Sequence, residues 1–180
     1  LASGVRPDTD TYTITARTSL TQLTALRLDV LADDRLPMQG PGRQDNGNLH
    51  LTEFEAVVFK PDAAESKRLK ISKATADFDQ AGWTIAHALD GDVKTAWGIH
   101  PRVGQSHHAV FELNEPLGLN PSSHLVIILK QLHGVGHLIG RLKLYATDAA
   151  GASAEVLPEL VSSAIKLPRE QRSPEQTAAI

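Results

Sequence analysis

The feature that most constrains the fold is a hydrophobic alternation with a period of two residues, which recurs in short segments along the chain. Residues 11–16 read TYTITA and residues 26–30 read LRLDV, so apolar and polar side chains alternate in both. Successive side chains of a β-strand point to opposite faces of the sheet, so each segment predicts a half-buried strand. The alternation returns in residues 107–113 and 141–145, whereas residues 125–129, LVIIL, are apolar on both faces, as in a central strand.

The segment NLHLTEFEAVVF also alternates, but its pattern changes phase part of the way along. Leu49 and Leu51 belong to one phase, and the apolar side chains from Phe54 onward belong to the other. The change falls near Thr52 and Glu53. One extra residue in a strand produces such a shift, so the sequence predicts a β-bulge at this point.

Turn-forming residues separate these segments, most densely in the stretch GPGRQDNGN, and residues 61–70 are expected to form a charged connection. Short strands, frequent turns and little helix predict an all-β fold, namely an antiparallel β-sandwich or jelly roll. We expect this sandwich to occupy residues 1–166 and to be the ligand-binding part of the chain.

Only the C-terminus carries a helical signal. In the segment SPEQ, Ser173 is a predicted N-cap, Pro174 takes the first helical position and Gln176 completes a capping box. We interpret residues 167–180 as a linker and the start of a helix that belongs to a following domain. The chain begins at Leu1 without a signal-peptide pattern, which suggests a piece of a longer protein.

Composition excludes several classes of partner. The net charge of the 180-residue chain is −3, and lysines and arginines do not cluster, so a nucleic acid is not an expected partner. There is no cysteine to form a disulfide, and no apolar run approaches the roughly 20 residues that span a bilayer, so no membrane partner is expected.

The segment HALDGDVKTAW places oxygen-bearing side chains around a glycine. Asp90, Asp92 and Thr95 lie within six residues of one another. Calcium takes six to eight oxygen ligands, which a tight turn at Gly91 can bring together. The spacing differs from that of an EF-hand loop, and on its own it favours an ordinary Asp-Gly turn with self-capping side chains.

This segment resembles the signature A-x-D-G-(N/D)-x-x-T-x-W of discoidin-type, galactose-binding-like β-sandwiches, which include many bacterial carbohydrate-binding modules. The resemblance implies a structural calcium ion and assigns Trp97 to the core. The implied ligands are Glu53, Thr52, His87, Asp90, Asp92 and Thr95, of which Glu53 and Thr52 come from the segment TEFEA. In a typical discoidin domain the glutamate strand follows the Asp-Gly loop, whereas here it precedes it. Either the sandwich is permuted or elaborated, or the Glu53 match is accidental.

Most of residues 11–147 is also similar to a module of large secreted planctomycete proteins that carry cytochrome c-like domains. The phrases that carry this similarity include LTALRLDVL, GPGRQDNGNLHLTEFE, FDQAGWTIAHALDGDVKTAWGIHP, HHAVFEL and GRLKLYAT. The resemblance implies an extracellular or periplasmic location, flanking domains in the parent protein, and a carbohydrate-binding or adhesive role.

Sugar recognition needs an aromatic face and planar polar groups. Aromatic residues make up only 4% of the chain, so Trp83 in the loop QAGW is the main candidate for a platform, although packing beneath its loop is an equally good interpretation. If the polar loops converge at one end of the sandwich, they form a groove beside it. The candidate ligand-binding residues are Trp83, His100, Arg102, Gln105, His108, Arg43 and Asn46.

The histidines do not indicate an enzyme. His133 and His137 in HGVGH have the spacing of a zinc-protease helix, but the segment lacks the glutamate, and its two glycines favour a turn between strands. His107 opens a strand on its apolar face, where we expect a buried, hydrogen-bonded side chain. The chain has no nucleophile elbow and no phosphate-binding loop.

Together these observations predict a non-catalytic carbohydrate-binding module that contains a structural calcium ion and targets a larger secreted protein to a polysaccharide or oligosaccharide. The alternative is a structural or protein-docking domain that links neighbouring domains and has no glycan ligand.

Overall fold

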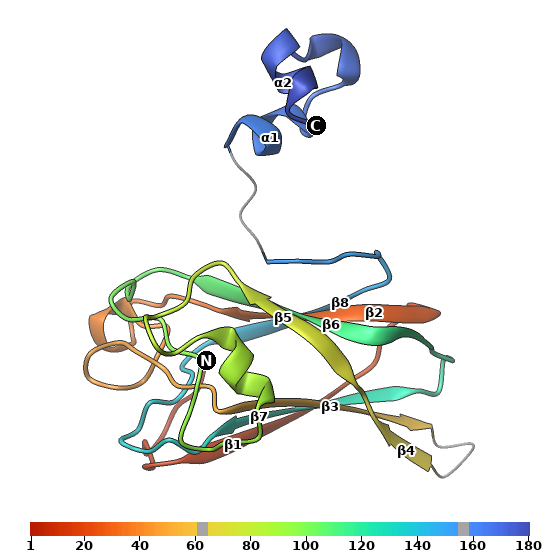
Figure 1. The fold of residues 1–180 in the computed structure, drawn as a ribbon. Coiled ribbons are helices and arrows are strands. Elements are labelled where there is room, and N and C mark those ends of the chain that lie inside the picture. The colour runs from red at the N-terminus through yellow and green to blue at the C-terminus, as the bar shows by residue number, and fades with distance from the viewer. Residues whose placement is uncertain (61–64, 155–158) are drawn as a thin grey trace.

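The chain folds into two antiparallel β-sheets packed face to face. The computed structural model describes residues 1–60, 65–154 and 159–180. One sheet has the strand order β1-β7-β3-β4, and the other has the order β5-β6-β2-β8 (Figure 1). The strands are β1 (Asp10–Ala16), β2 (Gln22–Val30), β3 (Glu53–Lys60), β4 (Glu65–Arg68), β5 (Ile71–Ala76), β6 (His107–Gly118), β7 (His124–Gln131) and β8 (Leu142–Thr147). Every strand pairing in the described residues is antiparallel, so the predicted all-β sandwich is confirmed.

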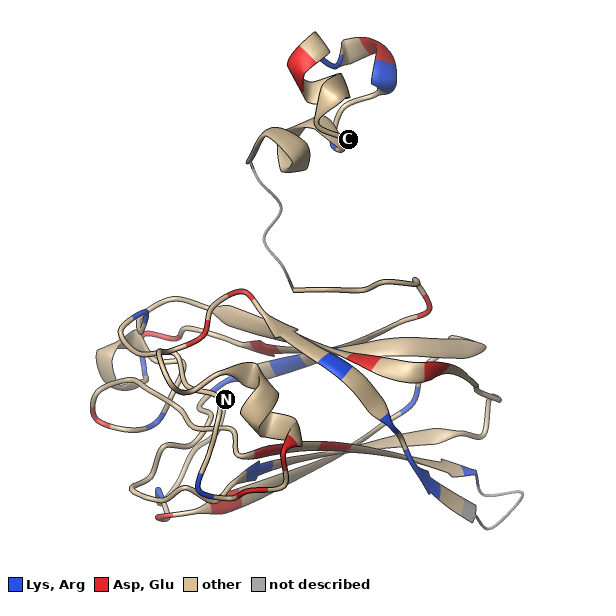
Figure 2. Cartoon of the chain, viewed as in Figure 1, with Lys and Arg blue, Asp and Glu red and all other residues tan. Residues whose placement is uncertain are grey.

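The core lies between the two sheets, and its side chains come from alternate positions of each strand. In β7, one of the two inner strands of its sheet, Leu125, Ile127 and Leu129 are buried, and the residues between them are half-buried on the other face. The rings of Phe54 on β3 and Phe111 on β6 stack across the gap, with centroids 3.6 Å apart. Charged side chains of both signs are distributed over the strands and loops (Figure 2).

The phase change before β3 has the arrangement of a β-bulge. The Thr52 amide donates to the Lys130 carbonyl at 2.9 Å, and Lys130 is also the register partner of Glu53. Two consecutive residues therefore face one residue of β7, which is how a bulge is defined. The extra residue lets Leu51 and Phe54 both reach the core in spite of their opposite phases.

The short helical segments lie in the loops and at the C-terminus. They are η1 (Pro37–Gln39), η3 (Ile85–Leu89), α1 (Glu159–Ala164), η4 (Arg169–Gln171) and α2 (Pro174–Ala178). Ser173 and Gln176 form the predicted capping box at the start of α2. Among the described helices, none has the length and apolar content needed to cross a membrane.

Strand β4 and helix α1 are among the elements that were not expected from the sequence, as are η1 and η3, which lie outside the C-terminal segment that carries the helical signal. Residues 65–68 form β4 within the expected connection, of which residues 61–64 lie outside the described part of the chain. Helix α1 falls within residues 1–166, and the Gln176 side-chain amide on α2 donates to the Ser163 hydroxyl on α1 at 3.2 Å. Strand β4 and helix α1 are both too short to display a hydrophobic period.

Truncation of Trp97 is expected to destabilise the fold strongly. The side chain is fully buried, as expected for a core residue, and its indole N–H donates to the Phe78 carbonyl at 3.0 Å. Trp97→Ala should lower the free energy of unfolding by about 3–5 kcal/mol in denaturant titration. Phe59→Ala is the matched control, because Phe59 is an exposed aromatic residue of β3, and a loss of similar size there would contradict the assignment.

Candidate functional site

Several loops meet at the end of the sandwich where β3 begins. Leu51 and Trp97 exchange two backbone hydrogen bonds of 3.0 and 2.9 Å, which joins the start of β3 to the end of the Asp-Gly segment. The Gln80 amide donates to the Gly98 carbonyl at 3.0 Å, and the Gly104 amide donates to the Gly40 carbonyl at 2.6 Å. The convergence that the polar-groove hypothesis requires is therefore present at this end.

Four residues bring oxygen atoms together here, and we call Glu53, Asp90, Asp92 and Thr95 the oxygen cluster. The Thr95 hydroxyl oxygen lies 2.8 Å from Asp90 Oδ2 and 2.9 Å from the Asp92 carbonyl oxygen. A hydroxyl group has one hydrogen and can donate it to only one of these two acceptors. The Thr95 backbone amide also donates to the Asp92 carbonyl at 3.1 Å, so the Thr95 hydroxyl can donate to Asp90.

The Asp-Gly segment is at the same time a tight turn. Gly91 has a φ of 80°, and the Asp92 amide donates to Asp90 Oδ1 at 2.8 Å. The Lys94 amide donates to Asp92 Oδ1 at 2.9 Å. The side chain of Asp92 thus caps the turn, whereas its carbonyl group faces Thr95.

Glu53 lies against this turn from the other segment. Glu53 is buried, with 6% of the residue exposed, and its Oε1 atom has no hydrogen-bond partner. Burial and then the charge of Asp90 raise the pKa of Glu53, whereas a hydrogen bond from the Gly91 amide lowers it. The glutamate therefore stands beside the Asp-Gly turn in space, although it precedes the turn in the chain.

The two remaining predicted calcium ligands flank the cluster. His87 lies in η3, which ends at Leu89 with Asp90 as its C-cap, and its Nδ1 atom is 3.3 Å from the Ala96 carbonyl oxygen. The Thr52 hydroxyl donates to the Lys130 carbonyl at 2.9 Å and accepts from the Leu132 amide at 3.2 Å. Because both side chains are engaged elsewhere, these residues have only their backbone carbonyls to offer an ion.

A network centred on Asn48 gathers three of the candidate glycan ligands. Asn48 Oδ1 accepts from the amides of Ile99 and His100 at 3.0 and 3.2 Å, and its Nδ2 donates to Gln80 Oε1 at 3.0 Å. The backbone amide of Asn48 donates to Asn46 Oδ1 at 2.9 Å. The Trp83 amide donates to the Gln80 carbonyl at 2.8 Å, so Trp83, Asn46 and His100 share one neighbourhood.

The other candidate glycan ligands make separate contacts. The Arg43 guanidinium donates to the Gly4 carbonyl at 2.9 Å, and the Arg102 guanidinium lies 4.5 Å from the centre of the Phe78 ring. His108 lies on β6, and its Nδ1 atom is 3.8 Å from Asp77 Oδ2. Gln105 is exposed in the loop before β6.

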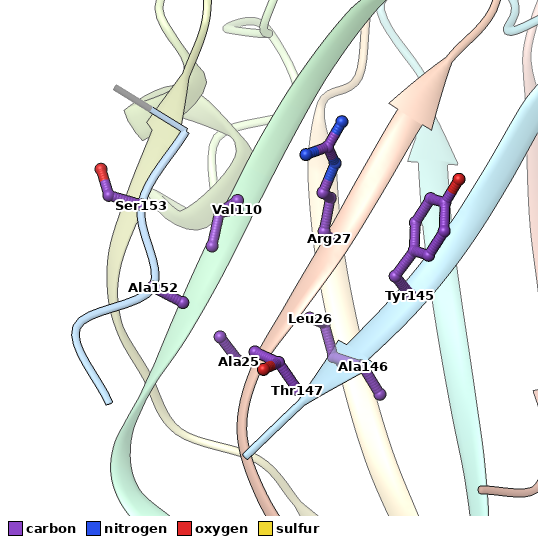
Figure 3. A pocket seen from close by; sticks show the side chains of 9 residues that line it. All are labelled: Ala25, Leu26, Arg27, Val110, Tyr145, Ala146, Thr147, Ala152 and Ser153. Atoms are coloured by element: carbon purple, nitrogen blue, oxygen red, sulfur yellow. The ribbon is translucent and has the colours of Figure 1, made fainter. Parts of the chain in front are cut away.

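A pocket on the outer face of the second sheet lies apart from these residues (Figure 3). Arg27 and Tyr145 border it from β2 and β8, and Ser153 lies on its other side. Its volume is about 430 Å³, and none of the predicted site residues lines it. The Arg27 guanidinium is paired with Asp29 at 2.6 Å, so its charge is already neutralised.

Sequence reasoning missed a group of three histidines, His50, His133 and His137, which we call the histidine cluster. His133 and His137 come from HGVGH, which forms a turn as predicted, and His50 comes from the segment before β3. The His50 ring is stacked on Trp83, with centroids 4.5 Å apart and planes within 2°. One face of the candidate platform is therefore covered. The spacing within HGVGH was visible in the sequence, but nothing there pointed to His50.

His107 and Asp77 form a buried pair behind the loops. His107 is 3% exposed, its Nδ1 is 3.0 Å from Asp77 Oδ2 and its Nε2 is 2.7 Å from the Arg102 carbonyl oxygen, so the predicted buried, hydrogen-bonded histidine is confirmed. Burial is the largest single influence and opposes both charges, but the bond between the two side chains, their attraction, and the backbone hydrogen bonds with Arg102 and His108 together outweigh it, so the pKa of His107 is raised and the pKa of Asp77 is lowered.

This pair predicts a pH-dependent stability. Because the pKa of His107 is raised, this residue contributes to the free energy of unfolding. The contribution is complete below the ordinary histidine pKa of 6.5 and is lost as the pH rises. Because the pKa of Asp77 is lowered, its contribution to the free energy of unfolding is complete above the ordinary aspartate pKa of 3.8 and is lost as the pH falls. Asp77→Asn should therefore destabilise most between these two values, by about 1.5–3 kcal/mol in denaturant titration. A loss that is constant with pH would contradict the charged pair.

Comparisons with protein-family models, with curated proteins and with solved structures found no match to this chain. A functional assignment therefore depends on the chemistry of its own residues. Three groups among the described residues bear on such chemistry, namely the oxygen cluster, the polar loops around Trp83 and the histidine cluster.

Proposed function

We propose that this chain is a non-catalytic carbohydrate-binding module, held in shape by a calcium ion, which attaches a larger secreted protein to a polysaccharide. The observation that carries the proposal is the oxygen cluster, in which the buried Oε1 atom of Glu53 has no partner and the charge of Asp90 helps to raise the pKa of Glu53. A buried charge without a partner is costly. A cation between the two acids would remove that cost.

The available donors fit calcium. Every candidate ligand atom is an oxygen: the carboxylates of Glu53 and Asp90, the hydroxyl of Thr95 and the backbone carbonyls of Thr52, His87 and Asp92. Such mixed carboxylate and carbonyl sets are typical of calcium sites. The ion would supply two positive charges and tie the Asp-Gly turn to the start of β3.

The polar loops supply the recognition chemistry. Trp83 is half-buried and has one face stacked on His50, so the apolar C–H side of a sugar ring would have to stack on the opposite face. His100 and Asn46 lie in the same hydrogen-bond network as the Trp83 loop, and Arg102 follows His100 by two residues. Imidazole, amide and guanidinium groups can bond to sugar hydroxyls.

Calcium is expected to raise the melting temperature, because an ion that binds only the folded state stabilises it by about 2.7 kcal/mol at a concentration 100 times its Kd. Glu53→Gln should abolish this increase. Without calcium the same variant should be at least as stable as the parent, since it removes a buried charge beside Asp90. Differential scanning calorimetry with calcium or with chelator measures both effects.

Asp92→Asn is the matched control. It keeps the Asp92 carbonyl group and an acceptor oxygen for the Lys94 amide, so the response to calcium should remain. If chelator leaves the melting temperature of the parent unchanged, the segment is an ordinary turn and the calcium proposal is wrong.

Glycan binding is expected to be weak, with a Kd of about 0.1–1 mM, because few hydroxyl bonds and one stacked ring exceed the cost of ordering a flexible chain only slightly. Affinity electrophoresis on neutral, uronic and sulfated polysaccharides should show retardation by at least one of them. Trp83→Ala should abolish the retardation, and Tyr145→Ala, which removes an exposed aromatic ring elsewhere, should not. No retardation by any polysaccharide would favour a domain-linking role.

A further inference from the structure

The histidine cluster brings three imidazole rings together from two distant segments. His50 precedes β3, and His133 and His137 follow β7. One ligand nitrogen from each ring lies within 4.8 Å of the other two. The shortest approach is 3.1 Å, between Nδ1 of His50 and Nδ1 of His133.

The backbone holds the cluster in place. Gly134, Val135 and Gly136 have φ values of 102°, 57° and 67°, and three consecutive positive values reverse the chain tightly, so His133 and His137 face His50 together. The His50 amide donates to the His137 carbonyl at 2.9 Å. From the N-terminal segment, Asp8 Oδ1 accepts from the Val135 amide at 2.6 Å.

The His133 and His137 rings have nitrogens that act as acceptors. Asn48 Nδ2, which can only donate, lies 3.4 Å from His50 Nε2, so Nδ1 carries the hydrogen of the neutral His50 ring and His133 Nδ1 accepts it at 3.1 Å. His137 Nδ1 is 3.3 Å from the Gly134 carbonyl oxygen, to which it can only donate, and this leaves Nε2 as an acceptor. Burial, followed by the neighbouring His137 and His133, lowers the pKa of His50 to about 3, and burial likewise lowers the pKa of His137.

We propose that the histidine cluster binds one divalent transition-metal ion of the zinc, nickel or copper class. Imidazole nitrogen suits these ions, whereas calcium takes oxygen ligands. A metal–nitrogen distance of about 2.1 Å at a tetrahedral angle separates two ligand nitrogens by about 3.4 Å, close to the 3.1 Å between His50 and His133. The site shares no residue with the oxygen cluster and does not depend on the proposed function.

Binding requires one ring movement and a change of tautomer at His50, which moves the ring hydrogen to Nε2 and gives up the 3.4 Å contact with Asn48. The rings of His50 and His137 are stacked, with centroids 4.1 Å apart and planes within 12°, and lone pairs lie in the ring planes. Both cannot point at one ion in this arrangement. His133 already stands at 87° to His50, so rotation of the half-buried His137 ring completes a three-histidine site with a position open to solvent.

Trp83 provides a reporter inside the site. Its ring lies 4.5 Å from that of His50 and 4.8 Å from that of His133. Copper(II) bound at this distance quenches tryptophan fluorescence. Titration of the tag-free chain with copper(II) should therefore quench the emission of Trp83 in proportion to occupancy, and Trp83→Phe should remove this response and leave the emission of Trp97.

Calorimetry with zinc chloride tests the site directly. We expect one ion per chain, and His133→Gln and His137→Gln should each weaken binding by about tenfold or more. Both side chains are half-buried, so these variants are preferred to one at the buried His50, and unchanged melting in the absence of zinc verifies their fold. His100→Gln, a change of an exposed histidine in a neighbouring loop, should leave the affinity unchanged.

Two further results separate this site from the oxygen cluster. Excess calcium should not displace zinc, and Glu53→Gln should bind zinc as the parent does. Equal zinc affinity in the parent, His133→Gln and His137→Gln, or no detectable binding to the parent, would overturn the proposal. Zinc that is displaced by calcium would also overturn it, because the ion would then occupy the oxygen cluster.

Discussion

The pair of backbone hydrogen bonds between Leu51 and Trp97 positions both candidate sites. On the C-terminal side of Leu51, the chain reaches Glu53, which meets the Asp-Gly turn that precedes Trp97. On its N-terminal side lies His50, which meets Trp83 and the turn after β7. Because Trp97 is anchored in the core, the loops around it share one rigid support. The imidazole nitrogens of the histidine cluster thus lie on one side of the Leu51–Trp97 contact, and the oxygen atoms of the oxygen cluster lie on the other.

The separation of nitrogen and oxygen donors bears on metal selectivity. The oxygen cluster offers carboxylate, carbonyl and hydroxyl groups, and the histidine cluster offers imidazole. Hard and borderline cations differ in their preference for these donors, so the proposed calcium and transition-metal ions would be separated by donor chemistry and not by size alone. The two sites could be filled independently while acting on the same set of loops.

The sequence predicted what depends on local periodicity. The strands around Leu28, Phe111 and Leu144, the phase change at Thr52 and the cap at Ser173 each leave a pattern within a few residues. Helix α1 and strand β4 were missed because six and four residues are too few to show a period. The proximity of His50 to His133 arises from strand pairing across the sheet and three positive φ angles, neither of which any short segment displays. The acids of the oxygen cluster were found through a family resemblance, since spacing alone favoured a turn.

The position of Glu53 beside the Asp-Gly turn depends on the one extra residue of the bulge at Thr52. Leu49 and Leu51 reach the core in one phase, and Phe54 and the residues after it do so in the other. A deletion of a single residue between Leu51 and Phe54 would restore an unbroken alternation and leave both apolar sets inside. The sandwich would then keep its core, while Glu53 would no longer stand beside the Asp-Gly turn. Gain or loss of this acid during evolution would need only one codon.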